Sequence, residues 1–324
     1  MSPGGSTLQL PVDEAMEAWR KIKGGFMIDH EKEGKKQDGI SRRQFLKFCG
    51  VVAGALGLDP TFGPKIFEAF AAGPKPSVLW LHFAECTGCT EALLRTSNPG
   101  FADLIFDTIS LDYHETLMAA AGDTVGQILT STAEQNKGQF FCVVEGAIPT
   151  AAGGAYGWIG GRTMLSIAQE ICPKAKAIIA IGNCASYGGL PAAAPNPTGA
   201  AGVEDALGTG LTVPVVNLPG CPPNPVNFVG VIANYLLQGT LPALDANGRP
   251  TFAYGETVHS QCPFRENESR CLEDFGCKGK ICDNNCPTIK FNDATSFPML
   301  AGHPCIGCSE PDFWDTMTPF YQKP

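Results

Sequence analysis

The chain has 324 residues, of which 44% are apolar and 17% charged, so it can bury a large core, and its 38 glycines and 26 prolines indicate long loops. Residues 1–71 hold 10 basic and 9 acidic side chains, so the net charge of −9 comes from the rest of the chain. An acidic surface repels phosphate, which argues against a nucleic-acid partner, whereas it suits a basic protein partner.

Residues 41–71 have the parts of an export signal. Ser41 to Lys47 (SRRQFLK) matches the twin-arginine pattern, Phe48–Leu58 is moderately apolar, and Ala69–Ala71 (AFA) offers a cleavage site. The apolar stretch is short and contains several glycines, so it is a poor membrane span. We therefore expect residues 1–71 to be a twin-arginine signal region with an N-terminal extension, which directs a folded protein to the periplasm. A charged turn before a buried helix is the alternative.

Apolar runs alternate with helical segments through the middle of the chain. The runs cover 77–83, 108–113, 140–145, 177–181 and 213–218, and the helical segments cover 90–97, 124–136, 162–171 and 225–238. This alternation predicts an α/β domain over residues 72–238, with a doubly wound parallel sheet. Such sheets place ligands at the carboxyl ends of their strands. Residues 239–324 lack regular periodicity, which predicts a smaller, loop-rich domain.

Thirteen of the fourteen cysteines lie after residue 85, and most have the spacing of metal ligands. Cys86 and Cys89 follow the first predicted strand, while Cys184 and Cys221 follow two later strands. Because the carboxyl ends of parallel strands meet at one edge, these thiols would converge there, as one [4Fe–4S] cluster requires. A secreted disulfide framework is the alternative, although such scaffolds are usually small.

A set of ordered motifs points to one family. The motifs are Glu85–Glu91 (ECTGCTE), Asp112–Met118 (DYHETLM), Val144–Pro149 (VEGAIP), Gly182–Gly189 (GNCASYGG), Pro219–Asn224 (PGCPPN), Gly276–Gly279 (GCKG), Asn285–Pro287 (NCP) and Gly302–Cys308 (GHPCIGC). Over residues 75–318 the chain resembles the small subunit of nickel–iron uptake hydrogenases. The resemblance implies a flavodoxin-like sheet, an electron-transfer role, and a nickel–iron centre held by a large partner subunit.

The resemblance also implies three clusters in a row. The ligands would be Cys86, Cys89, Cys184 and Cys221 for a proximal [4Fe–4S] cluster, His259, Cys262, Cys271 and Cys277 for a distal [4Fe–4S] cluster, and Cys286, Cys305 and Cys308 for a medial [3Fe–4S] cluster. Gly88, Gly189 and Pro298 stand where oxygen-tolerant or four-iron relatives carry cysteines. Their presence implies ordinary clusters and standard oxygen sensitivity. Cys282 is an extra cysteine with no assigned role.

Electrons would leave near His259 for a cytochrome or a membrane quinone-linked partner, through which the protein could also associate with a membrane. Glu85 and Glu145 border the proximal motifs and belong either to a proton path or to the partner interface. We expect no nucleotide cofactor, because no glycine-rich phosphate loop follows a strand. The related cluster-bearing subunit of respiratory complex I is the alternative family. It would lack the export signal, His259 and the medial cysteines.

Overall fold

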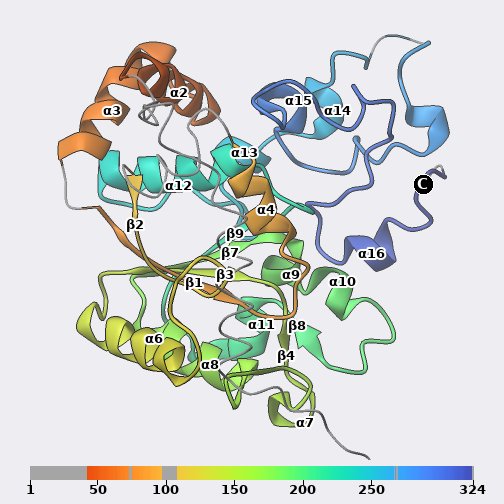
Figure 1. Cartoon of the computed structure of the whole chain (residues 1–324). Helices are drawn as coiled ribbons and strands as arrows, with labels where there is room; N and C mark the ends of the chain where they lie inside the picture. The colour runs from red at the N-terminus through yellow and green to blue at the C-terminus, as the bar shows by residue number, and fades with distance from the viewer. Residues whose placement is uncertain (1–41, 73–74, 97–107, 266, 268, 323–324) are drawn as a thin grey trace, which may run out of the picture. The chain divides into compact units, whose positions relative to one another are not determined.

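The computed structural model describes residues 42–72, 75–96, 108–265, 267 and 269–322 (Figure 1). The N-terminal extension, Ser41 of the twin-arginine heptad and residue 97 of the predicted helix 90–97 lie outside the described residues. Ile40–Pro324 form one compact unit.

The centre of this unit is a parallel sheet of five strands. The strands are β1 (Ser77–His82), β2 (Ser110–His114), β3 (Phe141–Glu145), β7 (Ala177–Ile181) and β9 (Val215–Leu218). Their order is β2-β1-β3-β7-β9, and every neighbouring pair is parallel. This is the strand order of flavodoxin-like folds. The predicted flavodoxin-like, doubly wound parallel sheet is therefore confirmed.

Helices cover both faces of the sheet. On one face, Leu93 of α4 (Gly88–Leu94) and Phe228 of α12 (Pro225–Gln238) share a core with Val78 and Trp80. The core on the other face contains Leu79 and Leu81, together with residues of α6 (Asp123–Gln135), α8 (Met164–Ile171) and α11 (Val203–Leu207). Alternate residues of each buried strand therefore pack against the helices on opposite faces of the sheet.

All four predicted helices are present: α4, α6 and α8 have shifted ends, and α12 has the bounds that the sequence predicts. Shorter elements connect the main ones: β4 (Ile148–Pro149), α7 (Ala151–Gly154), β5 (Trp158–Ile159), β6 (Arg162–Thr163), η4 (Cys172–Lys174), α9 (Gly182–Tyr187), α10 (Gly189–Ala192), β8 (Ala200–Ala201) and η5 (Gly208–Gly210). The carboxyl ends of β7 and β9 lead directly into α9 and into the loop before α12, where two of the candidate thiols lie.

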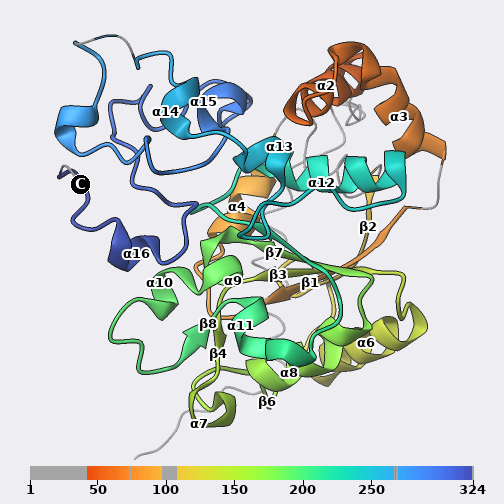
Figure 2. The same cartoon turned by 180° about the vertical axis from the view of Figure 1, so that it is seen from behind.

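The predicted signal region forms two helices joined by a short 3-10 turn. They are α2 (Arg42–Ala55), η2 (Pro60–Phe62) and α3 (Gly63–Ala72). Both helices contact α12, and Phe48, Val52 and Ile66 belong to the same core as the adjacent sheet face. Figures 1 and 2 show α2 and α3 on the side of α12 that lies away from the sheet. Among the described residues, no helix combines the length and apolar character needed to cross a membrane.

The C-terminal part has little regular structure. Its elements are α13 (Thr251–Tyr254), α14 (Val258–Gln261), η6 (Glu273–Phe275), α15 (Cys286–Ile289) and α16 (Phe313–Thr316). It has a small core of its own, formed by Val258, Cys262, Phe264, Cys282, Phe297, Met299 and Cys305. Cysteines thus make up part of its interior, in agreement with the predicted cysteine-rich, loop-rich second part.

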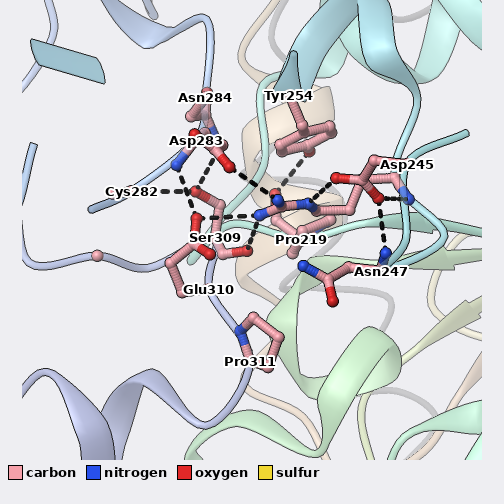
Figure 3. A network of polar contacts seen from close by, with 12 residues as sticks. Pro219, Asp245, Asn247, Tyr254, Cys282, Asp283, Asn284, Ser309, Glu310 and Pro311 are labelled. Carbon is pink, nitrogen blue, oxygen red and sulfur yellow. Dashed lines mark hydrogen bonds and ion pairs between the residues drawn. The ribbon is translucent and has the colours of Figure 1, made fainter. Parts of the chain in front are cut away.

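A buried arginine ties this part to the sheet. Arg249 is 3% exposed and lies 2.7 Å from Asp245, 3.0 Å from Asp283 and 2.9 Å from Glu310. It also donates a hydrogen bond to the backbone carbonyl of Ser309. Figure 3 shows these groups converging beside Tyr254, whose hydroxyl donates to the carbonyl of Pro219. One guanidinium group therefore links the two segments that hold the medial candidate ligands, residues 282–286 and 305–310.

Candidate metal centres

Four candidate thiols gather at the carboxyl edge of the sheet. Cys86 follows β1, Cys89 lies in the first turn of α4, Cys184 lies in α9 directly after β7, and Cys221 follows β9. Burial raises the pKa of the Cys89 thiol well above its usual range. The charges of Glu145 and of the other three thiols raise it further. The structure therefore brings the predicted proximal donors together.

Three glycines fit closely around these sulfur atoms. A Cβ at Gly182, whose φ is +85°, would lie 2.5 Å from Cys89 Sγ, and one at Gly189 would lie 2.8 Å from Cys184 Sγ. A Cβ at Gly88 would lie 3.1 Å from Cys86 Sγ. The thiols thus lie in a cradle that side chains at these positions would fill. Gly88 and Gly189, the positions singled out in the sequence, both border it.

Glu145 holds the helix that carries Cys89. It is 1% exposed, and its Oε1 accepts the backbone N–H groups of Cys89 and Thr90, each at 3.1 Å. Its Oε2 accepts the Thr90 hydroxyl at 2.5 Å and Trp80 Nε1–H at 3.1 Å. The carboxylate thereby satisfies backbone donors in the first turn of α4, as negative groups do at helix N-termini.

Glu145 also belongs to a buried group of titratable side chains. His82 Nδ1 lies 3.4 Å from Glu85 Oε1 and 3.8 Å from Glu145 Oε2, and the His82 ring packs against His114 at 4.6 Å. Burial, followed by the charge of Glu145, raises the pKa of Glu85. Burial and the neighbouring His82 lower the pKa of His114 to about 3. Two carboxyl groups and two imidazole rings are thus packed together at the sheet edge that carries the proximal thiols.

The predicted medial donors gather in the C-terminal part. Cys305 and Cys308 lie in the segment before α16, and Cys286 begins α15. Burial, and then the charges of Cys308 and Cys282, raise the pKa of the Cys286 thiol well above its usual range. The backbone N–H and the thiol of Cys286 both point to Asn284 Oδ1. Asn284 thereby fixes the orientation of this thiol.

Cys282 is a fourth thiol at this site. It is 1% exposed, lies 3.1 Å from the Ser309 hydroxyl, and raises the pKa of the neighbouring Cys305 thiol. The Ser309 hydroxyl donates to the carbonyl of Asp283, so its proton is already used. The Cys282 thiol therefore donates its proton to Ser309 Oγ.

The predicted distal donors line one small cavity. His259 lies on α14, Cys262 follows that helix, and Cys271 and Cys277 flank η6. Burial, and then the charges of Cys277 and Cys271, raise the pKa of the Cys262 thiol. The backbone N–H of His259 donates to the Gly279 carbonyl at 2.8 Å. The structure thus brings together all four donors of the predicted distal set.

The three groups of donors adjoin one another. The charge of Cys221, in the proximal group, raises the pKa of Cys308 in the medial group. Asn183, beside Cys184, donates to the Cys308 carbonyl at 3.0 Å. At the other end, the backbone N–H of Cys305 donates to Cys277 Sγ at 3.3 Å. The donors therefore form a continuous series from the sheet edge through the C-terminal part.

The donor sets fit iron–sulfur clusters. All fourteen cysteines are free thiols, and the thiols within each group raise one another's pKa. Thiols that oppose each other's ionisation are stabilised as thiolates when a cationic metal binds between them. Cys142 and Cys172 lie apart from these groups, with their Sγ atoms 4.0 Å apart in the core.

Some functional contacts had no sequence signal. The role of Glu145 in holding α4 depends on two strands being neighbours, and the place of Cys282 depends on the path of the loop around it. Arg249 lies far along the chain from Asp283 and Glu310. In each case, residues that are remote in sequence meet only in the fold.

Comparisons with known proteins agree with this geometry. Residues 86–235 match the family described as NADH ubiquinone oxidoreductase, 20 Kd subunit, and residues 254–321 match the C-terminal family of NiFe/NiFeSe hydrogenase small subunits. The first match covers the sheet and the proximal thiols, and the second covers the medial and distal donors. The fold and sites together define an iron–sulfur electron-transfer subunit.

Relatives that match most of the chain identify its family within this class of electron-transfer subunits. The chain is 50% identical over 315 residues to the periplasmic [NiFe] hydrogenase small subunit of Solidesulfovibrio fructosivorans, covering 92% of this chain and 98% of the relative. It is 45% identical to the quinone-reactive Ni/Fe-hydrogenase small chain of Wolinella succinogenes, over 88% of this chain and 84% of the relative. The chain belongs to the family of nickel–iron hydrogenase small subunits.

Solved structures agree. The [NiFeSe] hydrogenase of Desulfovibrio vulgaris Hildenborough matches with a TM-score of 0.72 and 37% identity, over 78% of this chain and 99% of that chain. The Ni-Fe-Se hydrogenase of Desulfomicrobium baculatum matches with a TM-score of 0.73 and 35% identity, over 78% of this chain and 100% of that chain. The predicted hydrogenase electron-transfer function is therefore confirmed at the level of the family.

Proposed function

We propose that this small subunit carries electrons along three iron–sulfur clusters between a nickel–iron large subunit and an external acceptor. Cys86, Cys89, Cys184 and Cys221 would hold a proximal [4Fe–4S] cluster, Cys286, Cys305 and Cys308 a medial [3Fe–4S] cluster, and His259, Cys262, Cys271 and Cys277 a distal [4Fe–4S] cluster. The observation that carries the proposal is the continuity of the donors, from Cys221 beside Cys308 to Cys305 beside Cys277.

The chain's own residues fix the spacing of the sites. When bound, the clusters supply one-electron chemistry. Arg249 and Asn183 hold the medial loop against the sheet, and Glu145 holds Cys89 at the sheet edge. Gly88, Gly189 and Pro298 supply no thiol, which supports ordinary cluster types and standard oxygen sensitivity.

The distal site is the proposed exit. His259 is only half-buried, and neutral imidazole adds no negative charge to its cluster. A cytochrome or a membrane quinone-linked protein would accept the electrons there. The name of the quinone-reactive relative favours the quinone-linked route, and the acidic balance of this chain favours a basic protein acceptor.

Glu85 and Glu145 would take part in a proton path. The alternative, that they face the partner, suits Glu145 less well because it is 1% exposed and fully hydrogen-bonded. Glu85 is partly exposed and directly precedes the exposed Cys86 in the chain, so it would be the outer proton carrier.

We further propose export to the periplasm by the twin-arginine route, with cleavage near Ala71. The chain would then consist of a signal region (1–71), a sheet domain (72–238) and a cluster domain (239–324). The periplasmic relatives support this location. The separate core of residues 258–305 supports the division of the mature chain.

Anaerobic purification tests the proposal. We expect the chain to co-purify with a nickel-containing large subunit. Iron and sulfide should be present in the proportions of two four-iron clusters and one three-iron cluster, and electron paramagnetic resonance should show an oxidised three-iron signal. A stable lone chain without iron or sulfide would refute the proposed function. Intact clusters without a nickel partner would instead favour another electron-transfer role.

A further inference from the structure

The helix α12 is buried on all sides, which is unusual for a helix that covers a sheet. Its residues Asn227 to Asn234 are all buried, whereas a covering helix normally shows one polar, exposed stripe. Phe228 packs against Trp80 at 5.6 Å, and Tyr235 packs against Phe141 at 5.0 Å, so these two residues mark the side that faces the sheet.

The opposite side of α12 is apolar as well. At about 100° per residue, Val226, Gly230, Ala233 and Leu237 project away from the sheet side. We call these four residues the outer face of α12. A Cβ at Gly230 would lie 3.0 Å from the ring of Phe252 in α13 and 3.7 Å from Leu56 Cδ2, so α13 and the segment following α2 share the cover of this face. None of the four side chains is polar, and Ala233 is 1% exposed.

The cover consists of the predicted signal helices. Phe45, Phe48, Cys49, Val52 and Ile66 of α2 and α3 are at most 9% exposed, and all belong to the core that α12 shares with the sheet. The first turn of α2 contains the twin arginines, since the helix begins at Arg42. In the uncleaved chain, the export signal is thus folded onto the protein that it exports.

Removal of residues 1–71 would uncover the part of the outer face of α12 that Phe252 does not cover. Soluble proteins rarely leave a contiguous apolar surface of this kind open, so the mature protein needs another cover. The location of this face indicates what would cover it in the mature protein. A cavity of about 660 Å³ is lined by Phe48 and Val51 of α2, Val229 of α12, and Gly88 and Cys221 of the proximal group.

The same removal would therefore open the surface directly beside the proximal thiols. In the proposed function, which this inference rests on, electrons enter there from the large subunit. We infer that α2 and α3 occupy a docking surface of the large subunit, so that helix packing and docking are mutually exclusive. Docking would displace the signal helices and free the twin-arginine segment once the two subunits have met.

Limited proteolysis of the full-length chain tests this inference. Trypsin can cut at Lys47 in α2 and at Lys65 in α3, which are both exposed on helices that must unfold locally before cleavage. We expect cleavage at both sites to be at least about tenfold faster in the complex with the large subunit than in the free chain, because cleavage follows the open population.

A matched pair of variants provides the control. Val52→Asp places a charge at a position that is 0% exposed, whereas Val51→Asp places it on a neighbour that is 48% exposed. Val52→Asp should make cleavage fast in the free chain, and Val51→Asp should leave it slow. Ile66→Asp on α3 serves as a second loosened variant, and unchanged iron content shows that the rest of the chain has folded.

Equal cleavage rates in the free chain and in the purified complex would overturn the inference, and so would equal behaviour of the two valine variants. Release of the helices by self-association, without the large subunit, would also overturn it. A failure to find iron or a nickel-containing partner is a different result, because it would refute the proposed function while leaving the helix packing measurable.

Discussion

Replacement of Arg249 by methionine should destabilise the protein strongly. Arg249 is 3% exposed and faces Asp245, Asp283 and Glu310, whose side chains are 22%, 35% and 13% exposed. Removing one partner of a buried ion pair typically costs about 3–5 kcal/mol, because the remaining charges stay buried without compensation. Water can reach Asp283 and Asp245, so we expect a cost near the lower end, about 3 kcal/mol.

The assay is thermal unfolding of the iron-loaded complex, followed by circular dichroism and by loss of cluster absorbance. For a chain of this length, about 3 kcal/mol corresponds to a fall of roughly 4–5 °C in the apparent midpoint. Lys280→Met is the control, because Lys280 is 54% exposed and its pair with Glu273 lies at the surface. It should produce no measurable change.

Because Arg249 contacts the segments of the medial site, its replacement can also be followed through the signals of the individual clusters. Because Arg249 holds the Ser309 carbonyl and Glu310, its loss should release the medial site before the proximal one. The three-iron signal should therefore disappear at a lower temperature than the proximal signal. If Arg249→Met and Lys280→Met have the same midpoint, the arginine carries little of the stability and the reasoning is wrong.

Three further changes test other contacts. His114 has a pKa of about 3 in the fold against 6.5 when unfolded, so the unfolded chain binds an extra proton between these values. Stability should fall by up to about 1.4 kcal/mol per pH unit below pH 6.5, and His114→Asn should flatten this slope in midpoints measured from pH 7 to 5. Glu145→Gln should lower proximal iron content, because the amide cannot accept all four hydrogen bonds at Cys89, Thr90 and Trp80; full occupancy would argue against this anchoring role. Cys282→Ala should lower the free energy of unfolding by about 1–3 kcal/mol, because Ser309 Oγ loses a buried donor, whereas Cys282→Ser should keep it near the parental value; equal midpoints of the two variants in thermal unfolding would mean that this hydrogen bond contributes no stability.

The sheet was predictable because its strands are buried on both faces and bounded by helices. Runs such as 77–83 and 177–181 have a simple local cause, namely burial of every residue after Ser77 in the first run and of every residue in the second. The convergence of Cys86, Cys184 and Cys221 followed from the same topology, since parallel strands end at one edge. Local pattern and connection rules therefore account for the proximal site.

The packing of α2 and α3 could not be predicted in this way. The run Phe48–Leu58 contains Gly50, Gly54 and Gly57, which weakens a helix by local propensity. Its helical form depends on burial against α12, whose outer face can be recognised only when the sheet side is known. Tertiary contacts here override a local preference, and one sequence alone does not reveal the partner surface.

The C-terminal part poses a different physical problem, because its core is too small to hold it alone. Apart from three thiols, the core cluster of this part consists of Val258, Phe264, Phe297 and Met299. A core of this size needs a further constraint, and metal ligation supplies one when the ligands are themselves core residues. Cys262 and Cys305 are such residues, so folding of this part should depend on loading of its sites. Loading must then come before any export of a folded chain, and the packed signal helices would keep the outer face of α12 covered during that time.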